Sequence, residues 1–514
     1  MSSEKNKALR SIFKGASIVF IGIAISKVLA LAFRVLVGRA LGPEDYGIIS
    51  VMMAVFSSAL VFGHMGINKG IQRYVSYHRE EDKEKMLSYA RTGFLLILIP
   101  STTVALILFA SAPWISVYIF NEPKLIWPIR MAALAIPFWG IARCCIAITN
   151  ALEKMQYKVY ISRIWANASE VALAFLLVYI GYGYLGAAFA YAFGFASASV
   201  LGLYYVRKIY PELFSGKKTS YNFRELWQYS WPLFAASTFG ILTSHIDTFM
   251  LQYFTGSESV GFYQAAYPFA ALLLIGKSAF SSIFLSRASF LASKSEKDLA
   301  ETFKTIIKWV FMITIPVFLL LIAYPRSVLV LFGEQYYTVE NVLRILLLGF
   351  LIHAVIAPAK EIYQAVGRTK IITTISIILG GFNIVLNAAL IPLYGITGAA
   401  IATAASFILI FIVKLFYIHK ITGEIPFKKS IAKVFISGLL TIGIILSISH
   451  TLFETAPEWF IIPAFLLFAL LYPLLLILTR SLEEDDLEII NTIEKKFPRL
   501  HPLVDIIRRL LTIE

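Results

Sequence analysis

Six ionisable side chains lie inside long apolar stretches of the sequence, where a charge is costly. They are Lys27, Arg34, Arg143, Lys277, Glu170 and Asp247. A charge near the centre of a lipid bilayer costs at least about 2.5–3.5 kcal/mol, so such a side chain usually faces a water-filled cavity or an oppositely charged partner. Lys27 and Arg34 are separated by close to two helical turns, and both therefore project from one face of a helix.

The four cations predict a positively charged chamber. Arginine and lysine are natural partners of phosphate groups, so this chamber suits an anionic, poorly permeant substrate such as a phosphate or pyrophosphate. Two interpretations of Glu170 and Asp247 remain open, namely structural pairing with one of the cations and a coupling site for Na⁺ or H⁺. No Ser/His/Asp set, phosphate-binding glycine loop or metal-ligand spacing occurs, which argues against an enzyme and predicts no cofactor.

Three other charged groups, Arg163, Lys360 and Glu361, fall near the cytoplasmic ends of predicted spans. We expect Arg163 to extend toward the membrane surface and the other two to be surface or gate groups. Asn383 and Asn387 share one helix face and predict interhelical hydrogen bonds.

Composition identifies the elements that must hold these side chains. The chain has 514 residues, of which 58% are hydrophobic and 15% are charged. Soluble domains are about 45–50% apolar and about 25% charged. Apolar runs of about 20 residues recur along nearly the whole chain, which predicts an all-α polytopic membrane protein. The net charge of +15 then reflects cationic cytoplasmic loops rather than nucleic-acid binding.

About fourteen membrane-spanning helices are expected. They are placed at 15–37, 46–68, 90–111, 127–150, 158–180, 184–206, 228–254, 260–286, 305–325, 341–366, 370–392, 396–417, 431–450 and 458–479. Lysine and arginine concentrate in alternate connections, so both termini are predicted to be cytoplasmic in a multi-pass protein of the cell (plasma or cytoplasmic) membrane.

An internal repeat divides these spans into two sets of six. The turn from Gly42 to Gly47 recurs from Gly256 to Gly261, and the segment that begins at Gly183 recurs from Gly395. Both copies have six spans and hence the same orientation, which predicts an axis along the membrane normal with the substrate path between the halves. The position that corresponds to Arg34 in the second copy is Thr248.

The repeat sets the predicted domain boundaries. They are an N-terminal six-helix lobe at 1–206, a cytoplasmic linker at 207–227, a C-terminal six-helix lobe at 228–417, two additional transmembrane helices at 418–480 and a cytoplasmic amphipathic tail at 481–514.

Two segments carry a resemblance to a known family. The stretch from Asn387 to Ser406, NAALIPLYGITGAAIATAAS, and the turn LGPEDYG that ends at Gly47 resemble hallmarks of polysaccharide-biosynthesis membrane transporters. These transporters belong to the multidrug/oligosaccharidyl-lipid/polysaccharide flippase superfamily, and the resemblance covers about residues 1–480. It implies two six-helix lobes arranged in a V, and alternating access that moves a lipid-phosphate-linked or lipid-pyrophosphate-linked glycan from the cytosolic to the outer leaflet.

The resemblance also bears on single residues. In related lipid II flippases, a serine followed by a cation in the first helix, with another cation further along, lines the cavity. Ser26 and Lys27 match the first part, whereas Arg34 follows Lys27 by seven residues and the six-residue position is Phe33. In those flippases two extra helices help to form a groove for the lipid tail, and the resemblance implies this role for the spans at 431–450 and 458–479.

Three functional classes compete. A flippase for a lipid-linked oligosaccharide, with membrane lipids and glycan-assembly enzymes as partners and the protein as a monomer, is the leading hypothesis. A drug or cation antiporter of the same superfamily would rely on acids in its cavity, whereas the first span here carries cations and no acid. A membrane scaffold would gain nothing from isolated buried charges.

Overall fold

The computed structural model describes residues 2–80, 82–215, 222–292, 294–454, 456–483 and 486. Within these residues every regular secondary-structure element is a helix, as the sequence predicts. Part of the predicted linker, 216–221, and the predicted amphipathic tail from 487 onward lie outside the described residues. The chain forms two compact units, one of Met1–Ala265 with Ile391–Ile396 and the other of Ala266–Leu390 with Thr397–Glu514.

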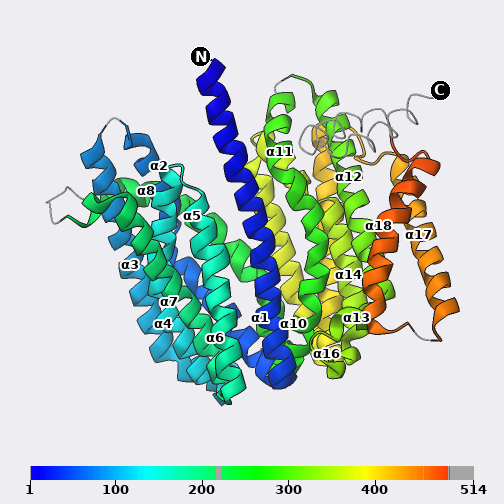
Figure 1. Ribbon diagram of the computed structural model, residues 1–514, viewed down its shortest axis with the longest axis horizontal. Coiled ribbons are helices and arrows are strands. Elements are labelled where there is room, and N and C mark those ends of the chain that lie inside the picture. Colours follow the sequence, from blue (N-terminus) through cyan, green and yellow to red (C-terminus); the bar gives the residue numbers. More distant parts are fainter. Residues whose placement is uncertain are drawn as a thin grey trace. The chain divides into compact units, whose positions relative to one another are not determined.

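Unit 1 is a bundle in which α4 packs against α3 and α7, and α6 packs against α7 (Figure 1). Its elements are α1 (Ser2–His64), α2 (Ile67–His78), α3 (Lys83–Trp114), η1 (Ile115–Ile119), η2 (Pro123–Leu125), α4 (Ile126–Ala151), α5 (Gln156–Lys158), η3 (Val159–Trp165), α6 (Ala166–Ile180), α7 (Gly183–Ile209), η4 (Pro211–Phe214), α8 (Phe223–Ser244) and α9 (Ile246–Thr255). Helix α10 (Ser257–Ala271) begins in this unit and ends in the next.

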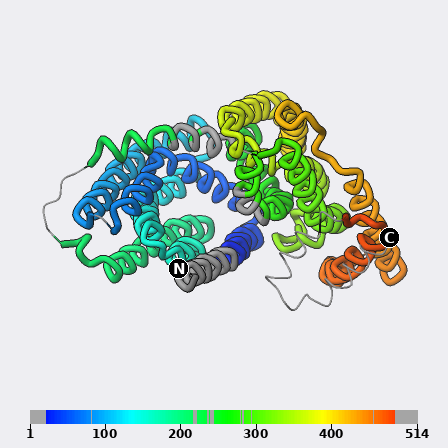
Figure 2. Tube along the Cα trace, turned by 90° about the horizontal axis from the view of Figure 1, so that it is seen from above, coloured from blue at the N-terminus to red at the C-terminus, as the bar shows by residue number. Residues whose placement is uncertain are grey.

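Unit 2 is built around α12, which packs against α11, α14 and α17. Its elements are η5 (Leu272–Leu274), α11 (Ile275–Ala292), α12 (Glu296–Ala323), α13 (Pro325–Leu329), η6 (Glu334–Val339), α14 (Glu340–Val355), α15 (Ala359–Ala365), α16 (Thr369–Thr422), α17 (Ser430–Leu452), η7 (Glu458–Phe460) and α18 (Ile461–Leu478). Figure 2 shows the helices of both units end-on. The predicted lobe boundaries are not tested by the division into units and stay predictions.

Eleven helical stretches in the described part of the chain are long and apolar enough to cross a membrane. Two of them, Gly22–His64 and Thr369–Thr422, each cover two predicted spans. The backbone leaves the helical region at Gly42 in α1 and at Gly395 in α16, so each long helix is two spans joined at a bend. The seventh predicted span corresponds to α8 and α9, which are separated at His245. The structure thus agrees with about fourteen spans.

The backbone repeats the turns that the sequence repeat predicts. Gly42 has φ 82° and ψ 177°, and its counterpart Gly256 has φ 84° and ψ 179°. Gly183 and Gly395 likewise have φ 53° and φ 54°. Positive φ is accessible to glycine at no steric cost, so these four positions explain why glycine recurs there. The matching torsion angles support an internal repeat.

The two repeated turns also contact each other inside unit 1. A Cβ atom on Gly47 would lie 1.7 Å from the carbonyl oxygen of Ser257, and a Cβ on Gly261 would lie 1.8 Å from that of Pro43. Gly47 corresponds to Gly261 and Pro43 to Ser257, so the contact is reciprocal. The close approach of the two backbones therefore requires glycine at both copies of this position.

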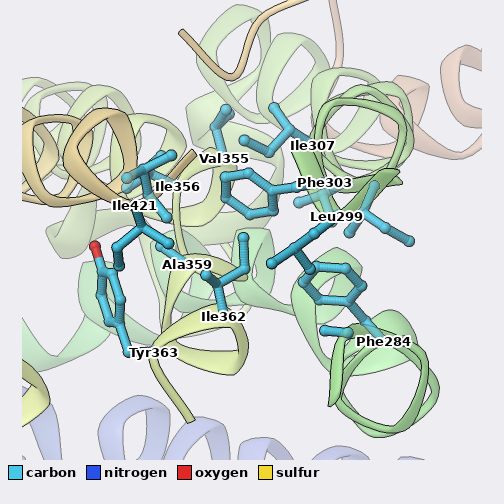
Figure 3. Close-up of a cluster of buried hydrophobic side chains, with 14 of the residues drawn as sticks. Phe284, Leu299, Phe303, Ile307, Val355, Ile356, Ala359, Ile362, Tyr363 and Ile421 are labelled. Atoms are coloured by element: carbon cyan, nitrogen blue, oxygen red, sulfur yellow. The ribbon is translucent and has the colours of Figure 1, made fainter. Parts of the chain in front are cut away.

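A buried apolar cluster fixes α11, α12, α14, α15 and α16 together in unit 2. Figure 3 shows Phe284, Phe303, Ile307, Ile362 and Tyr363 among its members. The hydroxyl group of Tyr363 donates a hydrogen bond to the carbonyl oxygen of Lys414, at 3.1 Å. This cluster holds the cytoplasmic ends that the sequence predicts for the tenth and twelfth spans in a defined register.

Candidate functional site: two clusters of cations

Four cations approach one another in unit 1. We call Lys69, Arg143, Lys158 and Arg163 the unit 1 cation cluster. Arg163 lies within electrostatic range of Arg143, and Lys158 lies within range of the other three. Arg143, Lys158 and Arg163 are half-buried, and Lys69 is exposed. Among the described residues, none of the four forms an ion pair with an acid.

The lack of acidic partners is clearest at Arg143. Its Nε atom is buried and has no hydrogen-bond partner in the described part of the structure. The guanidinium carbon lies 5.9 Å from the centroid of the Trp139 ring, a cation–π distance. Neighbouring His64 is buried, and its Nε2 atom is also unpartnered among the described side chains. Like charges without counter-ions repel each other, so this arrangement favours an anion from outside the chain.

Local backbone structure brings Arg163 into the cluster. Residues Val159–Trp165 form a π-helical segment, η3, which packs against α1, α6 and α7. Such segments widen the helix and frequently occur at functional sites. The side chain of Asn167 donates hydrogen bonds to the carbonyl oxygen of Arg163, at 2.8 Å, and to Oγ of Ser26, at 3.1 Å. The amide therefore ties the start of α6 to the first span.

Ser26 precedes Lys27, so this link also fixes the position of Lys27 on α1. Lys27 is exposed in unit 1, whereas Ser26 is buried. Lys27 therefore directly follows Ser26, whose hydroxyl group accepts a hydrogen bond from the same Asn167 amide that bonds to the backbone of Arg163.

Arg34 belongs to a different polar network of unit 1. Its Nη1 atom donates to Oε1 of Gln264, at 3.3 Å, and Nε2 of Gln264 donates to Oγ1 of Thr248, at 2.8 Å. Thr248 is the position that the sequence repeat matches with Arg34, so the side chains at the two equivalent positions both form hydrogen bonds with the amide group of Gln264. The hydroxyl group of Tyr46 donates to the backbone carbonyl of Gln264, at 3.1 Å, which fixes this residue further.

The two acids of the prediction occupy separate environments. Glu170 is buried, with 7% of its surface exposed, and lies within electrostatic range of Arg34. Asp247, at the start of α9, is half-buried and accepts a hydrogen bond from the hydroxyl group of Tyr263, at 2.8 Å. No ion pair of Glu170 is present among the described residues, and the bond from Tyr263 does not decide the role of Asp247. Both interpretations of the two acids, structural pairing and ion coupling, therefore stay predictions.

Unit 2 contains a second cluster, which we call the lysine–glutamate cluster: Lys277, Glu361 and Lys414. Lys277 and Lys414 lie within electrostatic range of each other and of Glu361. Lys414 and Glu361 are buried, with 7% and 6% of their surfaces exposed, and Lys277 is half-buried. Glu361 is therefore not a surface group, which corrects one of the two roles expected for it. Its neighbours Ala359, Ile362 and Tyr363 belong to the apolar core, so this part of α15 is buried.

Sequence reasoning found Arg143 and Lys277 but not most of their neighbours. Lys158, Arg163 and Lys414 lie near the ends of predicted spans, where long cationic side chains usually reach water. Their positions in the sequence therefore did not indicate a functional site. The π-helical segment that redirects Arg163 also has no clear sequence signature. Asn383 and Asn387 bond to each other, with Nδ2 of Asn387 at 3.0 Å from Oδ1 of Asn383.

Comparison with known proteins identifies the family. Residues 12–290 match the profile described as "Polysaccharide biosynthesis protein", which covers more than half of the chain. The chain belongs to this family. A second profile, MatE, matches residues 232–389, in agreement with the multidrug/oligosaccharidyl-lipid/polysaccharide flippase superfamily. The family assignment confirms the predicted multi-pass membrane transporter and the prediction that the protein is not an enzyme.

Individual relatives agree with this assignment. The chain is 24% identical over 439 residues to a probable low-salt glycan biosynthesis flippase of Haloferax volcanii, with 84% of this chain and 86% of that protein covered. The fold of the present chain is similar to that of the lipid II flippase MurJ in an inward closed conformation, with a TM-score of 0.73 at 18% identity. The match covers 91% of this chain and 99% of MurJ. An inward-facing multidrug resistance MATE transporter gives a TM-score of 0.65 at 16% identity, covering 79% of this chain and 97% of that one.

Proposed function

We propose that this family member is a flippase for an oligosaccharide joined to its lipid by a phosphate or pyrophosphate. It moves the head group from the cytosolic to the outer leaflet of the cell membrane by alternating access, with both termini in the cytosol. The glycan-flippase name of the archaeal relative and the MurJ-like fold support this class of substrate. Glycan-assembly enzymes would supply and consume the lipid, and the transporter would act as a monomer.

The observation that carries the proposal is the unit 1 cation cluster. Arg143, Lys158 and Arg163 approach each other without an acid in ion-pair contact among the described residues. Guanidinium groups bind phosphate oxygens in pairs, and a lysine ammonium adds a point charge, so the three suit a multiply charged phosphate group. The substrate-binding roles of Lys27, Arg34 and Lys277 stay predictions.

A gradient of Na⁺ or H⁺ could bias the cycle through Glu170 or Asp247. A ligand shifts a conformational equilibrium only by its differential affinity for the two states, so an uncoupled flippase would need removal of its product instead. Measuring transport with an imposed Na⁺ gradient, an imposed pH gradient and neither gradient distinguishes these three cases.

A cation antiporter is the alternative function, favoured by the MatE profile and the MATE-like fold. Its cavity would need carboxylates that are free to bind a cation. Glu170 lies within range of Arg34 instead, and the unit 1 cluster would repel a cationic drug. The charge distribution therefore favours the flippase.

Binding to purified full-length protein in detergent tests the proposal. The probe is a short-chain polyprenyl diphosphate disaccharide, and the variants Arg143→Met and Arg163→Met remove one charge each while keeping a long apolar side chain. A hydrogen bond to a charged group contributes about 1.5–3 kcal/mol, so each variant should weaken binding about 10- to 100-fold.

The matched control is Arg207→Met, which removes an exposed arginine of unit 1 at the end of α7. It should bind the probe like the wild type. If the two cluster variants bind as tightly as the control, the cluster does not hold the phosphate groups. If wild type binds a cationic dye and none of the diphosphate lipid, the antiporter replaces the flippase.

A further inference from the structure

One arginine of unit 1 is held by two aromatic rings at a predicted membrane boundary. Arg130 lies near the start of α4, where the candidate spans Lys83–Ile119 and Pro123–Ala151 meet. Its guanidinium carbon lies 5.0 Å from the ring centroid of Phe109 on α3 and 5.1 Å from that of Trp127, both cation–π distances. Its Nε atom is buried, and among the described residues Arg130 forms no hydrogen bond and no ion pair. The described part of the chain therefore positions this cation without neutralising it.

The internal repeat offers a matched comparison. The residue that corresponds to Arg130 in the second copy is Arg344, near the start of α14. Nη2 of Arg344 lies 3.4 Å from Oε2 of Glu340, four residues earlier, and Nη1 donates to Oδ1 of Asn341 at 3.0 Å. The position of Glu340 is occupied by Ile126 in the first copy. The second copy thus supplies a counter-ion for its arginine, whereas the first has an apolar residue in that place.

The surface beside Arg130 is apolar and exposed. Helices α3 and α4 pack side by side (Figure 1). Leu134 follows Arg130 by about one helical turn, and Leu106 precedes Phe109 by about one turn, so each leucine shares a helix face with a residue of the cation–π contact. The exposed fractions of Leu106, Leu134 and Trp127 are 65%, 57% and 56%. Such a surface on membrane helices suits lipid acyl chains, and tryptophan and arginine near a span end lie at the level of the head groups.

The chemistry of the arginine selects the head group. A guanidinium group binds phosphate oxygens in pairs, and Arg130 contributes a single positive charge. A phospholipid with one net negative charge balances that charge, whereas a zwitterionic lipid brings a second cation to the site. Arg143 of the unit 1 cation cluster lies 13 residues further along α4, which is about 20 Å along the helix axis, so the two sites are separate.

We propose that Arg130, Phe109 and Trp127 bind the phosphodiester group of an anionic phospholipid. The lipid belongs to the leaflet that the sequence predicts to be the outer one, and its acyl chains lie on the apolar surface that includes Leu106 and Leu134. The two rings hold the guanidinium group in place, so little side-chain freedom is lost when the phosphate binds. This inference does not depend on which substrate the protein transports.

Binding of short-chain lipids to the purified full-length protein in neutral detergent tests the site. The probes are phosphatidylglycerol, phosphatidylcholine and inorganic phosphate, and native mass spectrometry gives the number bound and the affinity. Wild type should bind one phosphatidylglycerol more tightly than phosphatidylcholine. Arg130→Met should weaken this binding about 10- to 100-fold, the range that charge-assisted hydrogen bonds provide. The matched control Arg344→Met should bind like wild type, because Glu340 and Asn341 already occupy that guanidinium group.

Ile126→Glu is a second test that keeps the arginine. It places an acid four residues before Arg130, as Glu340 precedes Arg344, and should weaken the binding of phosphatidylglycerol as well. The site would be overturned if Arg130→Met and Ile126→Glu both bound phosphatidylglycerol as tightly as wild type does, or if wild type showed no preference for it over phosphatidylcholine. Inorganic phosphate that bound equally tightly would replace the lipid with a free anion. Binding lost in Arg143→Met but kept in Arg130→Met would assign the lipid to the unit 1 cation cluster instead.

Discussion

A buried ion pair between Lys308 and Asp486 offers a stringent test of how unit 2 is held together. Neither side chain is exposed to solvent, and Nζ of Lys308 lies 2.5 Å from Oδ2 of Asp486. The carboxylate also accepts hydrogen bonds from Nε1 of Trp309, at 2.8 Å, and from the backbone N–H of Glu483, at 2.7 Å. The segment that follows α18 is thereby fastened to α12.

Removing the acid alone should be strongly destabilising. Asp486→Ala leaves the Lys308 ammonium group buried beside the carbonyl oxygen of Ser481, at 3.2 Å, and the carboxylate of Glu483, at 3.5 Å. Breaking one side of a buried pair costs about 3–5 kcal/mol. Because Glu483 compensates in part, we expect a loss near the lower end, about 3 kcal/mol in the free energy of unfolding.

The double variant Lys308→Met with Asp486→Leu separates the charge from the packing. Buried pairs replaced by apolar residues of similar volume are often neutral or more stable, so the double variant should recover most of the loss. Unfolding measured in mixed detergent micelles, with wild type and both variants side by side, gives the three free energies. The reasoning would be refuted if the free energy of unfolding of Asp486→Ala lay within about 1 kcal/mol of the wild-type value. It would also be refuted if the double variant were as unstable as Asp486→Ala.

Three further predictions concern stability. Gly47→Ala places a Cβ atom 1.7 Å from a backbone carbonyl oxygen and should destabilise the protein by about 1–3 kcal/mol in thermal unfolding; an unchanged transition would contradict the close helix approach. Ser295→Ala removes the hydroxyl group that caps α12 and should lower the stability by about 1 kcal/mol in the same assay, and an unchanged transition would contradict the cap. The backbone N–H of Lys85 holds the pKa of Asp82 below its ordinary value, so Asp82 stabilises the fold above the unfolded pKa of about 3.9 and loses this contribution as the pH falls through the lower folded value. The thermal stability of wild type relative to Asp82→Asn should therefore decline only under acidic conditions, and a difference that does not vary with pH would contradict this.

Much of the fold could be predicted because membrane helices leave a strong local signal. The apolar runs, and the glycines that bend α1 at Gly42 and α16 at Gly395, are visible without any long-range information. The reciprocal contact between Gly47 and Gly261 could not be predicted, since hydropathy specifies which segments cross the membrane and not which of them touch.

The candidate site was harder to predict for the same reason. Arg143 lies seven residues inside the end of the predicted fourth span, 127–150, and that alone marked it as unusual. Arg163 and Lys414 lie close to span ends, where a cation is ordinary, and only packing shows that they approach other cations. Lys308 is more extreme, because its partner Asp486 is 178 residues away in the sequence.

Translocation itself is the most direct test of the central proposal. Full-length protein is reconstituted into liposomes with a fluorescent polyprenyl diphosphate oligosaccharide, and a membrane-impermeant reagent that attacks the glycan is added outside. Wild type should make the inner-leaflet lipid accessible to the reagent, and Arg143→Met combined with Arg163→Met should not, although the folded protein is recovered. If the inner-leaflet lipid stays as protected with wild type as in protein-free liposomes, the protein does not flip this class of lipid.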